Sequence, residues 1–422
     1  MKLLFVHQNF PGQYRYLAPS LAADPANEVV AICDKGNDVP GRDLKRIRLL
    51  TYDPPSGWST PTHPYLRSFE AAVRRGQQVA RLCLALREQG FVPDVICAHP
   101  GWGDALYLKD IYPQSRLLCY LEYFYRSRGA EVGFDPEYPP SLDDLLHVRT
   151  RNALNLLSLQ SCDWGVCPTR WQWQLQPAEY QKKISVVFDG VDSSRIRPQP
   201  DTVLHLGAGK PSLSAADQVI TFVSRGLEPL RGWHSFIRAV PEIQRRHPRA
   251  QILVVGGDQP AYGAALADTT YKAKYLAEVA GSLDPSRIHF LDRIPFEQYL
   301  AVLQVSSAHI YLTYPFILSW SMLEAMACGC LVIGSCTAPV TEVLEDGVNG
   351  LLVDFFSAQQ IAGAVDGVFA HPDRMQQLRA RARQTVVERY DLKSICLPRQ
   401  LQLIHQLAGG LAPDGTPTRS LE

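Results

Sequence analysis

Short apolar segments alternate with helical stretches along the chain, and this alternation constrains the fold more than any other feature of the sequence. Helical patterns such as Gly232–His247, Phe296–Gln304 and Asp373–Tyr390 lie between apolar runs of strand length. The alternation is typical of parallel α/β layers, and each half has enough strands for a doubly wound sheet of its own. The expected strands are Lys2–Val6, Glu28–Cys33, Asp94–Ala98, Arg116–Leu121, Trp164–Pro168, Ile184–Phe188, Val219–Val223, Gln251–Val255, Ile288–Leu291, Ala308–Leu312 and Leu331–Gly334.

The length of 422 residues suits about two to three domains. Residues 192–218 are rich in Pro, Gly, Ser and Ala, which is a linker composition. We therefore predict an N-terminal domain over 1–200, a C-terminal domain over 201–390, and a final segment over 391–422. Two such domains facing one another would create a cleft at the carboxyl ends of their strands, where open α/β sheets bind ligands.

Composition excludes several classes of protein. Lys plus Arg number 42 and Asp plus Glu number 42, so there is no global basic field for nucleic acid. No apolar run approaches the roughly 18 residues that would span a bilayer. The ten cysteines are sparse and lie mostly in apolar segments, which favours buried thiols over a disulfide scaffold or a zinc site.

Several nucleotide-binding motifs are missing. The segment 205–212, HLGAGKPS, lacks the spacing of a phosphate loop and has Pro211 where Ser or Thr would bind magnesium. No G-x-G-x-x-G follows a strand, which removes the main support for a dinucleotide oxidoreductase. No D-x-D triplet occurs, which weakens the case for a metal-bridged diphosphate.

Two segments of the second half favour an anion site. A strand near Tyr314 is followed by a short loop and a helix that Gly329 ends, so backbone N–H groups at the helix start can bind an anion. Glu324 lies one turn further in, where a carboxylate could accept from ribose hydroxyls. Arg225 and Arg231 follow another strand and suit a diphosphate that develops charge as it leaves.

These motifs, in this order, resemble the retaining, GT-B-fold glycosyltransferases of family 4 (glycosyl transferases group 1). The resemblance touches nearly the whole chain. It rests on the N-terminal FVHQNFPGQYRYLAPSLA, on FDGVD at Phe188–Asp192, on Ser224–Gly232, on Glu324–Val332 and on Val343–Val353.

The resemblance implies two Rossmann-like α/β domains facing a central cleft and a C-terminal helix that crosses back to the N-terminal domain. It implies catalytic roles for Arg225, Arg231 and His99, with the two arginines on the donor diphosphate. It also implies donor-binding roles for Glu324, Ser319, Trp320, Ser321, Gly12 and Arg293. No cofactor and no metal are expected.

The implied activity is hexosyl transfer from a nucleotide diphosphate sugar to the hydroxyl of a glycan, a lipid-linked or a small-molecule acceptor, with retention. The N-terminal domain would bind the acceptor, and residues 101–140 hold nine aromatic residues that could stack on sugars or pack in the core. Polysaccharide or glycolipid biosynthesis and a cytoplasmic location would suit this activity. An arginine-rich helix from Arg67 to Arg87 leaves peripheral contact at the inner face of the membrane open beside a solvated face.

One departure from the family concerns the donor sugar. The first glutamate of the family's E-x7-E motif would fall at Phe316, and a phenylalanine cannot hydrogen-bond a sugar hydroxyl. Donor selection is therefore expected to differ from that of relatives that keep the glutamate. A catalytically silent nucleotide- or sugar-binding subunit and a GT-B nucleotide-sugar epimerase remain as alternatives.

Overall fold

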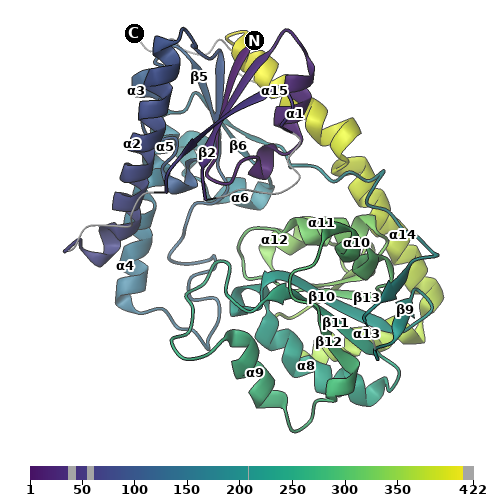
Figure 1. Ribbon diagram of the computed structural model, residues 1–422. Coiled ribbons are helices and arrows are strands. Elements are labelled where there is room, and N and C mark those ends of the chain that lie inside the picture. The colour runs from purple at the N-terminus through teal and green to yellow at the C-terminus, as the bar shows by residue number, and fades with distance from the viewer. Residues whose placement is uncertain (37–43, 55–60, 208, 412–422) are drawn as a thin grey trace. The chain divides into compact units, whose positions relative to one another are not determined.

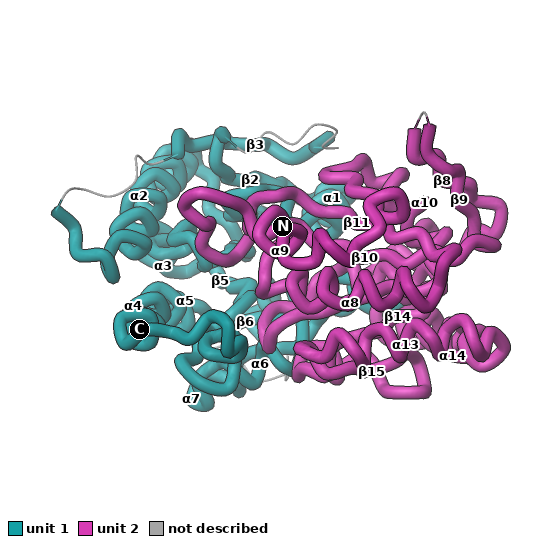
Figure 2. Tube along the Cα trace, turned by 90° about the horizontal axis from the view of Figure 1, so that it is seen from below, with its two compact units in different colours: residues 1–190, 393–422 teal, residues 191–392 magenta. Residues whose placement is uncertain are grey.

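The computed structural model describes residues 1–36, 44–54, 61–207 and 209–411. The chain divides into two compact units, residues 1–190 with 393–422 (unit 1) and residues 191–392 (unit 2) (Figure 2). The division falls at Gly190/Val191 and Leu392/Lys393, beside the predicted limits near 200 and 390. The end of the predicted final segment, from residue 412 on, lies outside the described residues.

Unit 1 contains a parallel sheet in the order β3-β2-β1-β4-β5-β6-β7. Its inner strands are almost entirely apolar because helices cover both faces of a parallel sheet. Six of the strands match predicted ones, whereas β3 was not predicted. The strands are β1 (Lys2–Val6), β2 (Glu28–Asp34), β3 (Ile47–Tyr52), β4 (Val95–Ala98), β5 (Arg116–Tyr120), β6 (Trp164–Cys167) and β7 (Ile184–Val186).

Helices flank this sheet (Figure 1). They are α1 (Leu17–Ala23), α2 (Arg67–Glu88), α3 (Leu108–Ile111), α4 (Leu142–Arg151), α5 (Ala153–Ser161), α6 (Arg170–Leu175), α7 (Ala178–Gln181) and α15 (Leu397–Ala408), with 3₁₀ turns at η1 (Gly12–Tyr14), η2 (Pro64–Leu66) and η3 (Pro100–Trp102).

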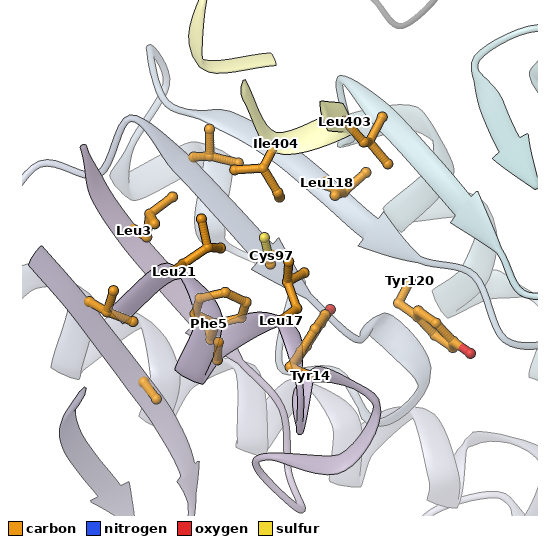
Figure 3. Close-up of a cluster of buried hydrophobic side chains, with 14 of the residues drawn as sticks. Leu3, Phe5, Tyr14, Leu17, Leu21, Cys97, Leu118, Tyr120, Leu403 and Ile404 are labelled. Atoms are coloured by element: carbon orange, nitrogen blue, oxygen red, sulfur yellow. The ribbon is translucent and has the colours of Figure 1, made fainter. Parts of the chain in front are cut away.

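The core of unit 1 shows why α1 and α15 belong to it. Leu17 and Leu21 are four residues apart on one face of α1 and pack with Phe5 of β1. Leu403 and Ile404 of α15 join the same buried cluster, although they come from the far end of the chain (Figure 3). The segment 391–422 therefore contributes a helix to the core of unit 1.

Unit 2 contains a second parallel sheet, in the order β12-β11-β10-β13-β14-β15. The two parallel sheets confirm the predicted class of two Rossmann-like α/β domains. The strands are β10 (Val219–Gly226), β11 (Gln251–Gly257), β12 (Ile288–Phe290), β13 (Ala308–Tyr311), β14 (Val332–Ser335) and β15 (Leu351–Val353).

The prediction of a linker over 192–218 was wrong. Strands β8 (Val203–His205) and β9 (Ser212–Ser214) pair antiparallel within this segment. Leu204 and Leu213 are buried in a cluster with Val219 of β10, so the segment is part of the core of unit 2.

The helices of unit 2 are α8 (Trp233–Arg246), α9 (Tyr271–Val279), α10 (Phe296–Gln304), α11 (Trp320–Ala327), α12 (Ala338–Thr341), α13 (Ala358–Ala370) and α14 (Pro372–Arg389), with 3₁₀ turns η4 (Pro229–Arg231) and η5 (Pro285–Arg287) and a π-helical turn η6 (Leu392–Cys396). Four of these helices, namely α8, α10, α11 and α14, match predicted ones, and α10 has the predicted limits, whereas α9, α12 and α13 were not predicted. Within the described residues, no helix is long and apolar enough to cross a membrane.

In both parallel sheets the order of strands reverses beside the strand of the sheet that comes first in the sequence. In unit 1 this switch point lies between β1 and β4, and in unit 2 it lies between β10 and β13. Parallel strands on the two sides of such a point send their following loops to opposite faces, which leaves a crevice at the carboxyl ends of the strands. The candidate sites are therefore sought at these two points.

Candidate functional site

Arg231 is the cation at the switch point of unit 2. It follows β10 and is buried, with 6% of its surface exposed. Its Nη1 donates to Oγ1 of Thr313 at 2.9 Å and to the carbonyl of Ile317 at 2.8 Å, and both partners follow β13. Gly232 allows this approach, because a Cβ there would lie 2.3 Å from Cβ of Leu312. The two loops at the switch point thus hold one guanidinium between them.

Aromatic rings flank the Arg231 guanidinium. Its Cζ lies 5.0 Å from the ring centre of Tyr262 and 5.9 Å from that of Phe316, and the two rings meet edge to face. Phe316 itself is buried, so its ring packs beside the cation. Such contacts favour a fixed, positively charged side chain.

Glu228 fixes the loop that carries Tyr262. The carboxylate is fully buried and accepts backbone N–H bonds from Ala261 at 2.9 Å, from Tyr262 at 3.3 Å and from Gly263 at 2.8 Å. Charge-assisted bonds of this kind are stronger than neutral ones. Glu228 therefore fixes the loop that places the Tyr262 ring beside Arg231.

Arg225 and Arg293 are the other two predicted arginines of unit 2, and both are exposed. Arg225 lies at the carboxyl end of β10, six residues before Arg231. Arg293 lies against the end of β11, since a Cβ on Gly257 would be 3.4 Å from its Nε. Asp292, which precedes Arg293, adopts a left-handed φ of +50°, a conformation that favours glycine.

The loop Ser319–Ser321 begins α11. Ser319 is the N-cap, and its Oγ accepts from the backbone N–H of Ser321 at 3.4 Å and from Oγ of Ser321 at 3.0 Å. The backbone N–H of Ser319 donates to the hydroxyl of Tyr311 at 2.8 Å. Trp320 is the first residue of the helix and is half-buried. The loop therefore stands at the helix start as predicted, with part of its donor capacity used within the protein.

Glu324 is buried in α11 and is held by Tyr299 of α10. The Tyr299 hydroxyl donates to Oε2 of Glu324 at 2.7 Å. Burial and the neighbouring Glu324 carboxylate raise the pKa of Tyr299, so this phenol remains a donor. The sequence indicated the helix that carries Tyr299, but nothing in its spacing pointed to this contact.

His99 is the predicted catalytic residue of unit 1 and lies just after β4. Its imidazole stacks between the rings of Trp102 and Tyr120, at 4.4 Å and 5.6 Å between ring centres. Only 2% of the residue is exposed. The neighbouring His7 follows β1, so the two histidines mark the switch point of unit 1, with ring centres 5.1 Å apart.

Gly12 sits directly against His7. It has a φ of +47°, and a Cβ at this position would lie 2.4 Å from Cε1 of the His7 ring. The resemblance implies that this glycine lets the first loop approach the donor. The structure gives a further reason for glycine, which is the space that the His7 ring occupies.

A pocket of about 320 Å³ opens beside His99. It is lined by side chains that follow β4 and β5 and by residues of α2 and α5. Its size falls within the range of about 300–1,000 Å³ that is usual for small-molecule sites. Four of the aromatic residues from the enriched stretch 101–140 line it, namely Trp102, Tyr120, Tyr123 and Tyr125. The remaining aromatic residues of that stretch do not line this pocket.

The structure thus brings the predicted residues of unit 2 to one sheet edge and those of unit 1 to another. Their roles in donor binding and catalysis stay predictions. Sequence reasoning missed the residues that hold them: Glu228, Tyr262, Tyr299 and His7.

Two family models match successive parts of the chain. The model described as glycosyl transferase family 4 group matches residues 25–196. The model described as glycosyl transferases group 1 matches residues 217–371. The matched segments contain the switch-point loops after β4 and after β10.

Sequence relatives match about half of the chain. The chain is 30% identical over 203 residues to a D-inositol 3-phosphate glycosyltransferase of Rhodococcus jostii. The matched region covers 47% of this chain and 42% of that protein. It is 33% identical over 174 residues to the enzyme of that name from Corynebacterium jeikeium, covering 40% of each chain. The chain thus spans less than half the length of these relatives.

Solved structures share the fold over nearly the whole chain. Sucrose-phosphate synthase of Thermosynechococcus elongatus has a TM-score of 0.73 at 18% identity, covering 97% of this chain and 99% of that one. Anabaena HepE, solved with UDP and glucose, has a TM-score of 0.68 at 16% identity, covering 96% and 99%. With the two family models and the motif order, this likeness identifies the chain as a member of the family 4 glycosyltransferases with the GT-B fold.

Proposed function

We propose that the protein transfers a sugar from a nucleotide diphosphate sugar to an acceptor hydroxyl, with retention of the anomeric configuration and without a metal ion. The observation that carries the proposal is Arg231, a buried guanidinium fixed by Thr313 and Ile317 at the switch point of unit 2. A buried cation held by neutral oxygens keeps its charge for an anionic ligand.

In the proposed reaction the bond between the anomeric carbon and the diphosphate oxygen breaks, and a bond to the acceptor oxygen forms on the same face. The acceptor proton passes to an oxygen of the leaving phosphate. Arg225 and Arg231 stabilise the charge that develops on the diphosphate, which is electrostatic catalysis by preorganised donors. No side-chain nucleophile takes part in this scheme.

Nucleotide selectivity and metal independence can be tested by thermal unfolding with UDP, GDP, ADP and dTDP, each with and without EDTA. A ligand at 100 times its dissociation constant stabilises by about 2.7 kcal/mol. UDP is the first nucleotide to test, because HepE was solved with UDP. We expect one nucleotide to raise the melting temperature equally in both conditions. A shift that EDTA abolishes would contradict the metal-free scheme.

Turnover can be tested by incubating the protein with UDP-glucose and an acceptor extract. A transferase releases UDP and forms a glycoside whose anomeric coupling, read by NMR, equals that of the donor. A silent subunit releases no UDP, and an epimerase interconverts the sugar without releasing it. Arg225→Ala and Arg231→Ala should each abolish most turnover with a modest effect on folding. Normal kcat in both variants would contradict the assignment of the arginines.

We also propose that the protein contacts a membrane surface peripherally, through η2 and α4. Leu66, Leu142 and Leu146 are exposed by 47%, 71% and 51% on η2 and α4, and Arg67 beside them is exposed as well. Apolar side chains next to a cation suit an anionic lipid surface. Flotation with phosphatidylglycerol vesicles should carry the protein upward, and Leu142→Ser should reduce this. Absence of the wild-type protein from the vesicle fraction would contradict membrane contact.

A further inference from the structure

The pocket of unit 1 contains a carboxylate that the sequence did not single out. Glu122 follows β5 and lines the pocket together with His99, Trp102 and Tyr120. Its side chain is 27% exposed, whereas that of His99 is 3% exposed. A half-buried carboxylate beside aromatic rings is a typical partner for the hydroxyls of a sugar.

Hydrogen bonds to both histidines define which ring nitrogen carries the proton. Nδ1 of His7 accepts the backbone N–H of Asn9 at 2.9 Å, so Nε2 bears the hydrogen and donates to Oε1 of Gln13 at 2.7 Å. Burial lowers the pKa of His7 to about 3, which keeps the ring neutral. Nδ1 of His99 accepts the backbone N–H of Gly101 at 3.2 Å, so its Nε2 also bears a hydrogen.

Gln13 connects His7 to Glu122 by hydrogen bonds, and the proton position on His7 determines how the Gln13 amide is oriented. Since the amide oxygen of Gln13 accepts from His7, its amide nitrogen donates, and it does so to Oε1 of Glu122 at 3.0 Å. Oε1 is therefore fixed by a chain of neutral donors that begins at the end of β1. The other carboxylate oxygen, Oε2, faces Nε2 of His99.

Oε2 of Glu122 and Nε2 of His99 are 3.6 Å apart, which is too far for a good hydrogen bond between them. Among the described residues, Nε2 of His99 is buried and has no hydrogen-bond partner. One oxygen atom can lie within hydrogen-bond distance of both groups. A hydroxyl satisfies both at once, because it donates to the carboxylate and accepts from the N–H.

We propose that Glu122 and His99 form a hydroxyl-binding pair for a sugar ring in this pocket, and that Glu122 determines which sugar is accepted. The same pocket is lined by Trp102, Tyr120 and Tyr125, and aromatic side chains commonly pack against sugar rings. Gln13 is a positioning residue that acts through Glu122. The inference rests on the proposed function and deepens it. The sugar belongs either to the donor or to the acceptor, and the two sources share the same chemistry.

Glu122→Gln tests the pair without changing its size. The amide oxygen of the new side chain would accept from Gln13, which leaves an N–H₂ group facing the N–H of His99. A hydroxyl could then no longer donate at that point. Glu131→Gln is the matched control, because Glu131 is a half-buried carboxylate of the same unit that does not itself line the pocket. It accepts from the hydroxyl of the pocket residue Tyr123 at 2.6 Å, and the amide oxygen of the new glutamine can still accept that bond.

The measurements are dissociation constants of the full-length protein for UDP, for UDP-glucose and for methyl glycosides of glucose, galactose, mannose and N-acetylglucosamine. If the sugar is the donor's, Glu122→Gln lowers the preference for UDP-glucose over UDP by about tenfold, which is the loss of one hydrogen bond to a charged group. If it is the acceptor's, that preference holds and methyl glycoside binding weakens by the same factor. In either case UDP affinity is unchanged.

Three results would overturn the inference. In the first, the wild-type protein binds no methyl glycoside and binds UDP-glucose no better than UDP. In the second, Glu122→Gln leaves the affinities for sugars unchanged. In the third, Glu131→Gln weakens sugar binding as much as Glu122→Gln does. Failure of the proposed function can be told apart from failure of this inference. If the proposed function is wrong, UDP binding or turnover is absent, and this is measured separately from sugar binding in unit 1. Gln13→Met should weaken sugar binding less than Glu122→Gln and leave UDP affinity unchanged, as expected for a positioning residue.

Discussion

The two switch points of this protein use the same topology to present opposite charges. In unit 2 neutral oxygens of Thr313 and Ile317 hold a guanidinium, whereas in unit 1 neutral donors from His7 and Gln13 hold a carboxylate. The loops after β10 and β13 therefore suit an anion, and those after β1, β4 and β5 suit hydroxyls. A Rossmann-like sheet fixes the place of a site, while the first few residues after each strand fix its chemistry.

The largest effect is expected from conservative replacement of the arginines in unit 2. Arg231→Lys should lower kcat by about 100-fold, because a lysine cannot keep the two bonds that Nη1 makes to Thr313 and Ile317 while it also donates to a diphosphate. Arg225→Lys should cost about tenfold or less, since Arg225 is exposed and a flexible ammonium can still reach an anion. Steady-state kinetics with UDP-glucose measure both. Equal losses would show that burial does not distinguish the two arginines.

Gly12→Ala should have the next largest effect, and it acts in unit 1. The new Cβ would overlap the His7 ring and would force a left-handed conformation on alanine. We expect about 1–2 kcal/mol of backbone strain, a drop in melting temperature of about 2–8 °C and a roughly tenfold loss of turnover. Gly90→Ala is the control, because Gly90 has a φ of +82° with nothing within 4 Å of its Cβ position. Loss of turnover in both variants would contradict a specific role for the His7 contact.

The sequence predicts the fold of this protein better than it predicts the contacts of the candidate site. The apolar alternation located eleven strands, and the resemblance located Arg231 and His99. Strand β3 was missed because its burial is mixed along Ile47–Tyr52, and β15 was missed although it is no shorter than β7 and β12, which were located. The hairpin at 203–214 was missed because its turn residues imitate a linker.

The supporting contacts could not be predicted, because they join distant parts of the sequence. Gln13 and Glu122 are 109 residues apart, and Glu228 reaches a loop 33 residues downstream. Periodicity carries no information about such pairs. In a sequence, a buried glutamate that binds backbone N–H groups looks the same as one on a solvated surface.

Glu228→Gln should have a smaller effect on unit 2 than the change at Arg231. Glutamine has one acceptor oxygen where Glu228 uses two, so at least one N–H of the loop at 261–263 loses its partner, at a cost of about 1–3 kcal/mol. Because Tyr262 is then less well fixed over Arg231, we expect UDP to bind about three- to tenfold more weakly. In a double-mutant cycle with Tyr262→Ala, the two losses should not add. Additive losses would show that Glu228 acts by another route.

The smallest effect at neutral pH is expected for His7→Gln. This change removes a titratable group from unit 1 and so tests whether neutral donors hold the carboxylate there. Glutamine can still donate to Gln13, but it does not titrate. In the wild-type protein the folded chain holds His7 neutral down to about pH 3, whereas an unfolded histidine takes up a proton near pH 6.5. Between these values the unfolded state binds more protons, so the free energy of unfolding falls as the pH falls, by up to about 1.4 kcal/mol per unit.

Melting temperatures of the wild-type protein and of His7→Gln between pH 7 and pH 4 measure this difference. Other groups near His7, including Glu122 and His99, are present in both proteins, so their own titrations largely cancel in the comparison. The two melting temperatures should be similar at pH 7, and the variant should lose less stability as the pH falls. Parallel curves would mean that His7 is not held neutral, and the chain of neutral donors that orients Glu122 would then lack its first member.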